Sequence, residues 1–220
     1  MVDVLNQVFE EKPDPMPAWK LAFGGAPDFV TAALCWLAWQ NPLALGAESV
    51  KKMTVVFLME FFVIHSGGFM ATFGNMPATR LGRIGAQSGF VAFYFLFIWA
   101  FAMSLHASWL YLAFGWLFFS KILVSWSATR GAKLAIREQL IDWPFAVAAY
   151  LLSMGAGFTT FEATRGGITE QVFLDAGLKD AGLFEDHPWV ALAGGSIYFT
   201  AMGLWRLRLW RWFARPAGAG

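Results

Sequence analysis

Six long apolar stretches alternate with polar connections along this chain. A helix rises 1.5 Å per residue and needs about 20 apolar residues to cross the hydrocarbon core of a bilayer. Each stretch has about that length. The pattern therefore predicts an all-α, polytopic transmembrane bundle. Its spanning helices are expected at residues 24–43, 53–74, 87–106, 108–127, 143–162 and 188–208.

Two connections carry a helical pattern of their own. Residues 129–142 place apolar positions among charges, which predicts a short interfacial helix on the cytosolic side. Residues 163–187 form an acidic outer loop with a helical pattern at 168–183, typical of a solvated lid helix or of a vestibule that attracts cations. The remaining organisation is a cytosolic or interfacial segment (1–20), one transmembrane domain (21–215) and a tail (216–220).

Composition supports the prediction of a membrane protein and excludes some classes of partner. Hydrophobic residues make up 58% of the chain and charged residues 14%, against roughly 25% charged residues in soluble domains. The lipid bilayer is therefore the expected surrounding. A net charge of +1 with no dense basic stripe excludes nucleic acid as a partner. The single cysteine excludes an intrachain disulfide.

Basic residues set the expected topology, because positive charge stays on the cytosolic side of a membrane. With the amino terminus inside, the inner segments hold Lys12, Lys20, Arg80, Arg83, Arg130, Lys133, Arg137, Arg206, Arg208, Arg211 and Arg215. The outer segments hold only Lys51, Lys52, Arg165 and Lys179. Both termini are therefore predicted to be cytosolic, in a membrane of the bacterial inner type.

Small residues indicate which spans pack at the centre. Helices in lipid associate through close contacts between small side chains. Such stripes contain Gly67 and Gly68 in the second span, Ser153 and Gly157 in the fifth, and Gly195 in the sixth. These three spans are expected at the centre. The third span is surrounded by aromatic residues and is expected to face lipid or another subunit.

Glu60 and His65 are the main chemical clue, because both lie within the apolar run 53–74. An ionisable side chain inside a span is costly unless it is paired or hydrated, so it marks a functional site by default. The two residues are five apart, about 140° around an ideal helix at 100° per residue. They do not share one face, so both are buried only if this span is central or distorted near its glycines.

A polar layer is the sharpest hypothesis that these positions allow. Asp28, His65, Lys121 and Thr200 fall at similar depth, with Glu60 about two turns further out. Each also has a simpler interpretation. Lys121 can extend its amine to the inner headgroups, Asp28 can cap the first span, His65 can bond a neighbouring carbonyl, and Glu60 can make a structural hydrogen bond between helices.

Three functions are consistent with these residues. The first is a small channel or transporter, as a homo-oligomer, with a proton or ion pathway past Glu60 and His65. The second is a non-catalytic subunit or assembly factor of a larger membrane complex. The third is an intramembrane enzyme that uses the two residues as acid and base. The solute and any cofactor stay open. No metal site is predicted, and the three histidines lie at depths that do not match for haem.

Overall fold

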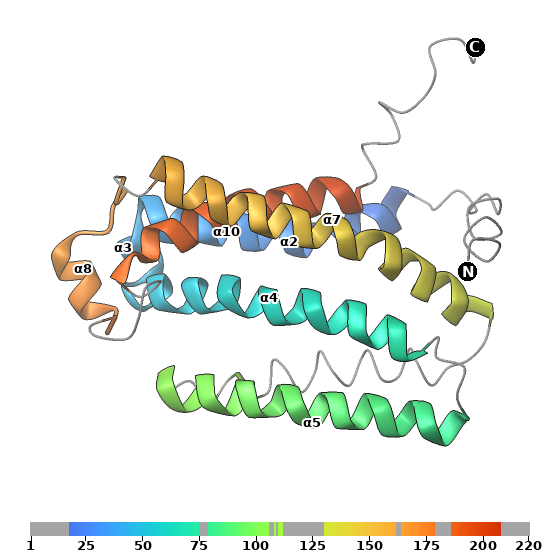
Figure 1. The fold of residues 1–220 in the computed structure, drawn as a ribbon. Coiled ribbons are helices and arrows are strands. Elements are labelled where there is room, and N and C mark those ends of the chain that lie inside the picture. Colours follow the sequence, from blue (N-terminus) through green and yellow to red (C-terminus); the bar gives the residue numbers. More distant parts are fainter. Residues whose placement is uncertain are drawn as a thin grey trace, which may run out of the picture. The chain divides into compact units, whose positions relative to one another are not determined.

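The computed structural model is a set of long helices (Figure 1). It describes residues 18–74, 79–105, 108, 110–111, 130–161, 164–178 and 186–207. Every regular element in these ranges is a helix, which confirms the all-α class. In chain order they are α2 (Ala18–Gln40), α3 (Pro42–Leu45), α4 (Glu48–Gly74), α5 (Arg80–Leu105), α7 (Arg130–Phe161), α8 (Glu170–Asp175) and α10 (Pro188–Arg206).

Two segments within the described ranges are long and apolar enough to cross a membrane. They are Ile84–Met103 of α5 and Asp142–Phe161 of α7. The span expected at 108–127 lies, apart from residues 108, 110 and 111, outside the described residues. The described helices at three other expected spans, α2, α4 and α10, do not meet this criterion. A bundle of six spans is therefore not confirmed and stays a prediction.

The last predicted span, 188–208, agrees closely with α10, whereas α2 begins six residues before the first predicted span. Two other predicted elements differ from the structure. The interfacial helix expected at 129–142 and the span at 143–162 are one continuous helix, α7. Pro144 lies inside it. Proline lacks a backbone N–H and removes one helical hydrogen bond, but here the helix continues through that gap.

The outer-loop helix is shorter than its sequence pattern suggests. It begins after Thr169, whose side-chain oxygen accepts a hydrogen bond from the Val172 amide at 3.3 Å. It ends at Asp175, and Gly177 follows in the left-handed conformation at φ +66°. Glycine adopts that conformation without steric cost, so it turns the chain away from the helix axis.

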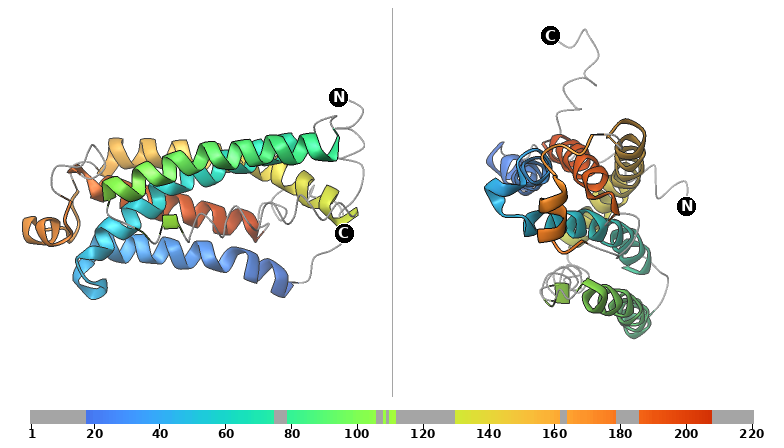
Figure 2. Two further views of the ribbon diagram at one scale, coloured as in Figure 1. Left: turned by 90° about the horizontal axis from the view of Figure 1, so that it is seen from below. Right: turned by 90° about the vertical axis from the view of Figure 1, so that its left-hand side faces the viewer.

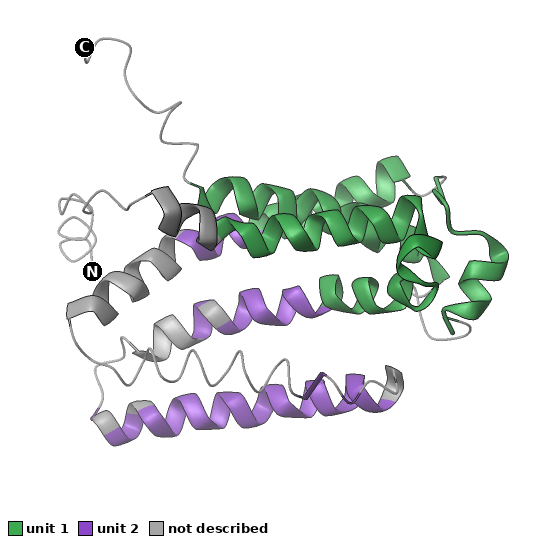
Figure 3. Cartoon of the chain, turned by 180° about the vertical axis from the view of Figure 1, so that it is seen from behind, with its two compact units in different colours: residues 1–58, 148–220 green, residues 59–147 purple. Residues whose placement is uncertain are grey.

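The chain divides into two compact units (Figure 3). Unit 1 comprises residues 1–58 and 148–220, and unit 2 comprises residues 59–147. Helix α4 begins in unit 1 and ends in unit 2, and α7 begins in unit 2 and ends in unit 1. The boundaries of the single domain expected at 21–215 stay a prediction.

Helix α10 forms the centre of unit 1. Of its 19 residues, 13 are buried. Figure 2 shows α10 between α2 and the C-terminal part of α7. The helices approach through small residues: a Cβ atom added at Gly157 of α7 would lie 2.8 Å from the Val190 carbonyl oxygen. A Cβ added at Gly203 would lie 2.8 Å from the Phe29 ring of α2.

Gly194 and Gly195 face the first half of α4, where the Phe57 ring packs against them. The same ring lies 4.9 Å from the Tyr150 ring and 6.2 Å from the Tyr198 ring, centroid to centroid. Three helices, α2, α4 and α7, therefore converge on α10 within unit 1. Helix α2 joins α4, α7 and α10 at this centre, although sequence stripes alone predicted only the last three.

One end of unit 1, here called the Trp39 end, is closed by the outer loop. Gly167 donates its amide to the Trp39 carbonyl at 2.9 Å, and the Trp39 indole donates to the Thr164 carbonyl at 3.1 Å. The loop buries apolar side chains against α2, α4 and α10. The cluster includes Ala38, Trp39, Val50, Ile168, Val172, Ala176, Leu178, Trp189, Val190, Leu192 and Ala193.

Unit 2 is held together differently. Its part of α4 packs against α5 through aromatic rings. Phe62 lies 6.1 Å from Tyr94, 5.7 Å from Phe97 and 5.5 Å from Phe101, measured between ring centroids. These contacts are typical of tilted and edge-on aromatic packing. Most of the outward surface of α5 is apolar and exposed.

Candidate functional site

His65 lies on α4 in unit 2, half-buried. Its Nδ1 lies 2.7 Å from the Phe61 carbonyl oxygen, one turn earlier. A carbonyl only accepts hydrogen bonds, so Nδ1 carries the hydrogen and the neutral ring has its basic lone pair on Nε2. The imidazole also lies against the Phe61 ring, with centroids 4.0 Å apart and planes tilted by 40°. The local bond fixes both the tautomer and the ring direction.

Glu60 is half-buried on the same helix and also belongs to unit 2. It precedes His65 by five residues, which corresponds to about 7.5 Å along the axis at 1.5 Å per residue. Neighbouring Ser66 is buried, and its hydroxyl donates to the Val63 carbonyl at 2.8 Å. This stretch of α4 therefore combines two ionisable side chains with one hydroxyl group that bonds to its own helix.

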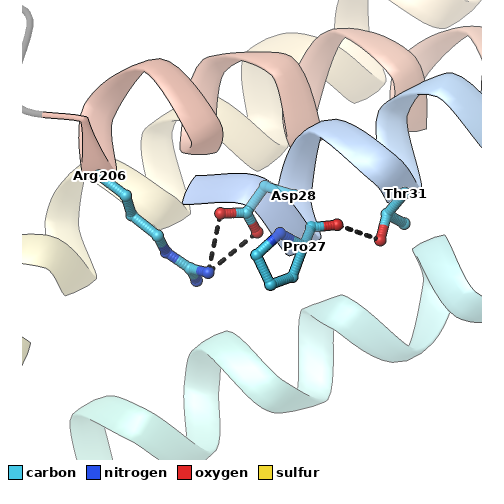
Figure 4. A network of polar contacts seen from close by, with 4 residues as sticks. All are labelled: Pro27, Asp28, Thr31 and Arg206. Atoms are coloured by element: carbon cyan, nitrogen blue, oxygen red, sulfur yellow. Dashed lines mark hydrogen bonds and ion pairs between the residues drawn. The ribbon is translucent and has the colours of Figure 1, made fainter. Parts of the chain in front are cut away.

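Asp28 has a different environment from the one expected. Helix α2 begins at Ala18, so Asp28 lies inside the helix, and its interpretation as a helix cap is wrong. Figure 4 shows it facing Arg206 at the end of α10. Nη1 of Arg206 lies 2.8 Å from Oδ2 of Asp28 and donates a hydrogen bond to Oδ1 at 3.0 Å. The Asp28 side chain is 8% exposed and that of Arg206 is 40% exposed.

This ion pair joins two helices that are 178 residues apart in sequence. Beside it, the Thr31 hydroxyl donates to the carbonyl of Pro27 at 2.8 Å (Figure 4). We call this the Asp28 end of unit 1. Sequence reasoning identified Asp28 but missed its partner. The available signal was the opposite charge of Arg206 at the same expected membrane side.

Thr200, the third expected member of the polar layer, bonds within α10. Its hydroxyl donates to the Ser196 carbonyl at 2.7 Å, and the Ser196 hydroxyl donates to the Leu192 carbonyl at 2.9 Å. Ser153 of α7 likewise donates to the Ala149 carbonyl at 2.6 Å. These hydroxyls are satisfied within their own helices, so they do not link helices to one another.

Of the other residues expected at the site or at helix contacts, some lie at helix contacts and others lie outside the described residues. Lys121 lies outside the described residues, and of Gly67 only the helical backbone is described. Gly195 faces Cys35 and Phe57 in unit 1. The Trp143 indole packs against Gly68 in unit 2. The two positions are 75 residues apart, and no sequence pattern predicted their contact. The polar layer as a whole stays a prediction.

The Trp39 end carries its charges on the outside. The Arg165 guanidinium carbon lies 4.8 Å from the Trp189 ring centroid, within the range of a cation–π contact. The same guanidinium lies 3.9 Å from the Glu170 carboxylate. In the part of the chain that the structure describes, no three His, Cys, Asp or Glu side chains gather as a group that would hold a metal ion.

No family model, curated protein or solved structure matches this chain.

Proposed function

We propose that the protein is an integral membrane protein of six spanning helices that provides a pathway for protons or a small cation past Glu60 and His65. The observation that carries this proposal is the hydrogen bond from His65 Nδ1 to the Phe61 carbonyl. It occupies Nδ1 within the helix and leaves Nε2 as the ring nitrogen that can contact a second group. Ionisable groups inside a span commonly serve proton and ion pathways.

The Phe61 contact supports the same role. Protonation at Nε2 leaves the Nδ1 hydrogen bond intact, because Nδ1 donates in both states. A positive imidazolium is also attracted to an aromatic face. The ring centroids are only 4.0 Å apart. His65 thus has a local environment that accommodates both its neutral and its charged form.

Glu60 is the second group of the proposed pathway. The two residues are separated by about 7.5 Å along α4 and by about 140° around it, which is too far for direct proton transfer. The proposed pathway therefore needs water molecules or other groups to carry the proton around the helix. Unit 1 is a poor place for such a pathway. Its Trp39 end is filled by an apolar cluster, and the hydroxyls of Ser153, Ser196 and Thr200 bond back to their own helices.

The expected topology is part of the proposal. Within unit 1, Trp39 and Trp189 lie at one end, while Asp28 and Arg206 lie at the other. Tryptophan is typical of a membrane interface, and arginine is typical of the cytosolic side. This supports an outer Trp39 end, an inner Asp28 end and cytosolic termini in an inner membrane of the bacterial type. A homo-oligomer would cover the exposed aromatic surface of α5.

The test is proton or cation flux into proteoliposomes that contain the full chain and a pH-sensitive dye. Glu60→Gln and His65→Ala are expected to abolish most of the flux while the protein stays folded in detergent. Glu48→Gln and His187→Ala are the matched controls, because they remove the same side chains from the ends of α4 and α10. Undiminished flux in both test variants would overturn the proposal.

A second candidate function is favoured by the outer surface of α5. Only 17% of its apolar span is buried. The exposed large side chains are Phe93, Phe95, Leu96, Phe97, Trp99 and Met103. A non-catalytic subunit or assembly factor would use this surface to contact other helices. It predicts no flux in any variant, together with loss of complex assembly when these aromatic residues are replaced by alanine.

A further inference from the structure

In unit 2, Gly68 of α4 packs against Trp143 of α7. A Cβ atom added at Gly68 would lie 2.6 Å from Nε1, 2.7 Å from Cε2 and 3.0 Å from Cδ1 of the indole. Cβ atoms do not approach other atoms this closely. Glycine is therefore the residue that lets the pyrrole edge of Trp143 rest on the α4 backbone at this turn.

This contact lies on the same face of α4 as His65, three residues further along the helix. Positions three and four apart are neighbours on a helix surface. Phe61 is four residues before His65, and Gly68 is three residues after it. Side chains on a helix lean toward its N-terminus, and the imidazole does lie against Phe61. The surface one turn beyond His65 is then occupied by the Trp143 indole.

The imidazole is thus bordered along α4 by an aromatic ring on each side. The Phe61 ring lies toward the start of the helix, and the Trp143 indole lies toward its end. With α4 running inward, as proposed above, Trp143 stands between His65 and the cytosolic face. The indole is 38% exposed, so it occupies the rim of this surface and is not part of a closed core.

We infer that Trp143 is the inner gate of the His65 site, a positioning residue that separates Nε2 from cytosolic water. The inference rests on the proposed pathway. A tryptophan is suited to this role because it is large, apolar over most of its surface and rigid. Pro144 follows it directly inside α7. Proline weakens the helix locally and is a common site of helix bending, so the indole sits where α7 bends most easily.

The first test measures water access at position 65 without relying on flux. Cys35 is the only cysteine, so a Cys35→Ala, His65→Cys chain carries one thiol, at the gate. In vesicles, a membrane-impermeant thiol reagent is added to either side. Adding Trp143→Ala is expected to raise the labelling rate from the cytosolic side about tenfold, because the water-excluding side chain is lost. Labelling from the other side is expected to stay unchanged.

Two further variants keep the test decisive. Trp99→Ala removes another half-exposed tryptophan of unit 2, 53% exposed, and is expected to leave labelling unchanged. Trp143→Phe retains a ring and is expected to give a rate close to that of the parent, even if Trp143→Ala fails to fold. Equal labelling with tryptophan and alanine at position 143, or equal increases from both sides, overturns the gate.

The second test measures flux in chains that keep His65. Trp143→Ala is expected to raise proton flux several-fold over the parent. Faster cytosolic labelling without flux in any chain would overturn the proposed pathway while leaving Trp143 as a barrier to water. Normal flux in the parent with unchanged labelling in Trp143→Ala would overturn the gate alone.

Discussion

The two units of this protein (Figure 3) join their helices mainly through different kinds of contact. In unit 1, glycine and other small residues bring α7 and α2 against the backbone of α10. In unit 2, α4 and α5 contact each other through phenylalanine and tyrosine rings. Unit 1 buries most of α10, whereas unit 2 leaves most of α5 exposed.

The contacts that tolerate substitution least and the ionisable residues of the proposed pathway lie in different units. Backbone-to-backbone contacts tolerate little change, because an added methyl group meets a carbonyl that cannot move aside. Ring-to-ring contacts can be repacked at lower cost. The ionisable residues Glu60 and His65 lie in unit 2, and the partly buried ion pair Asp28–Arg206 lies in unit 1. Unit 1 therefore holds the backbone contacts that tolerate least change, and unit 2 holds the proposed site.

The largest effect is expected from Arg206→Gln, which leaves the Asp28 carboxylate buried without its cation. Removing one partner of a buried ion pair costs roughly 3 to 5 kcal/mol. Arg206 is 40% exposed, so the lower end of that range is expected. Thermal unfolding in detergent micelles measures the loss.

Two controls test whether the stability lost in Arg206→Gln comes from charge or from packing. Arg165→Gln breaks an exposed pair at the Trp39 end and should leave stability nearly unchanged. Adding Asp28→Asn to Arg206→Gln should restore much of the lost stability, because the buried charge is then gone. No recovery in the double variant would show that Arg206 stabilises unit 1 by packing and not by charge.

The next largest effect is expected from Gly157→Ala. The added Cβ would meet the Val190 carbonyl oxygen at 2.8 Å. Separating α7 from α10 to relieve this contact should cost about 1 to 3 kcal/mol. Gly155→Ala is the matched control on the same helix, with no atom within 4 Å of the added Cβ. It should be neutral or stabilising by up to about 1 kcal/mol. Equal behaviour of the two variants would contradict the close-contact account of unit 1.

Much of the fold follows from local patterns. Apolar runs located α2, α4, α5 and α10, because helix length and apolar periodicity are properties of the chain itself. Small-residue stripes found Gly157 and Gly195, which do lie at close helix contacts. The continuity of α7 was missed, because Pro144 beside a charged segment resembles a helix boundary. Nothing local shows that a helix continues through a proline.

The site was less accessible to sequence reasoning. Glu60 and His65 stand out because charge inside an apolar run is rare, and that signal is local. Their partners are set by tertiary structure. The Asp28–Arg206 pair depends on the register between α2 and α10, and the Trp143 contact depends on how α7 crosses α4 within unit 2. Spacing along one helix carries no information about either register.

A smaller effect is expected from Phe62→Leu in unit 2. The leucine keeps an apolar volume but loses the three ring contacts between α4 and α5, each of the kind that contributes about 0.5 to 1.5 kcal/mol. Repacking of neighbouring rings should limit the net loss to about 1 kcal/mol. Trp99→Leu, at an exposed position of α5, should have little effect. A loss as large as that of Gly157→Ala would mean that the aromatic unit is packed as rigidly as the other.

The smallest effect is expected at the start of α4, where Glu48 and Lys52 form an exposed pair at 2.7 Å. The hydrogen bond and positive charge of Lys52 lower the pKa of Glu48 below its ordinary value. A lowered carboxyl pKa means that the folded protein favours the charged form. The resulting stability is present above the ordinary glutamate pKa and is lost as the pH falls through the lowered one. Thermal unfolding of the parent and Glu48→Gln should therefore differ slightly at neutral pH and converge in acid.

Arg206→Gln provides the contrast, because its effect at neutral pH should be many times larger. A difference for Glu48→Gln that persists in acid would mean that Glu48 acts through packing, and that exposed and buried pairs of unit 1 are less distinct than their burial indicates.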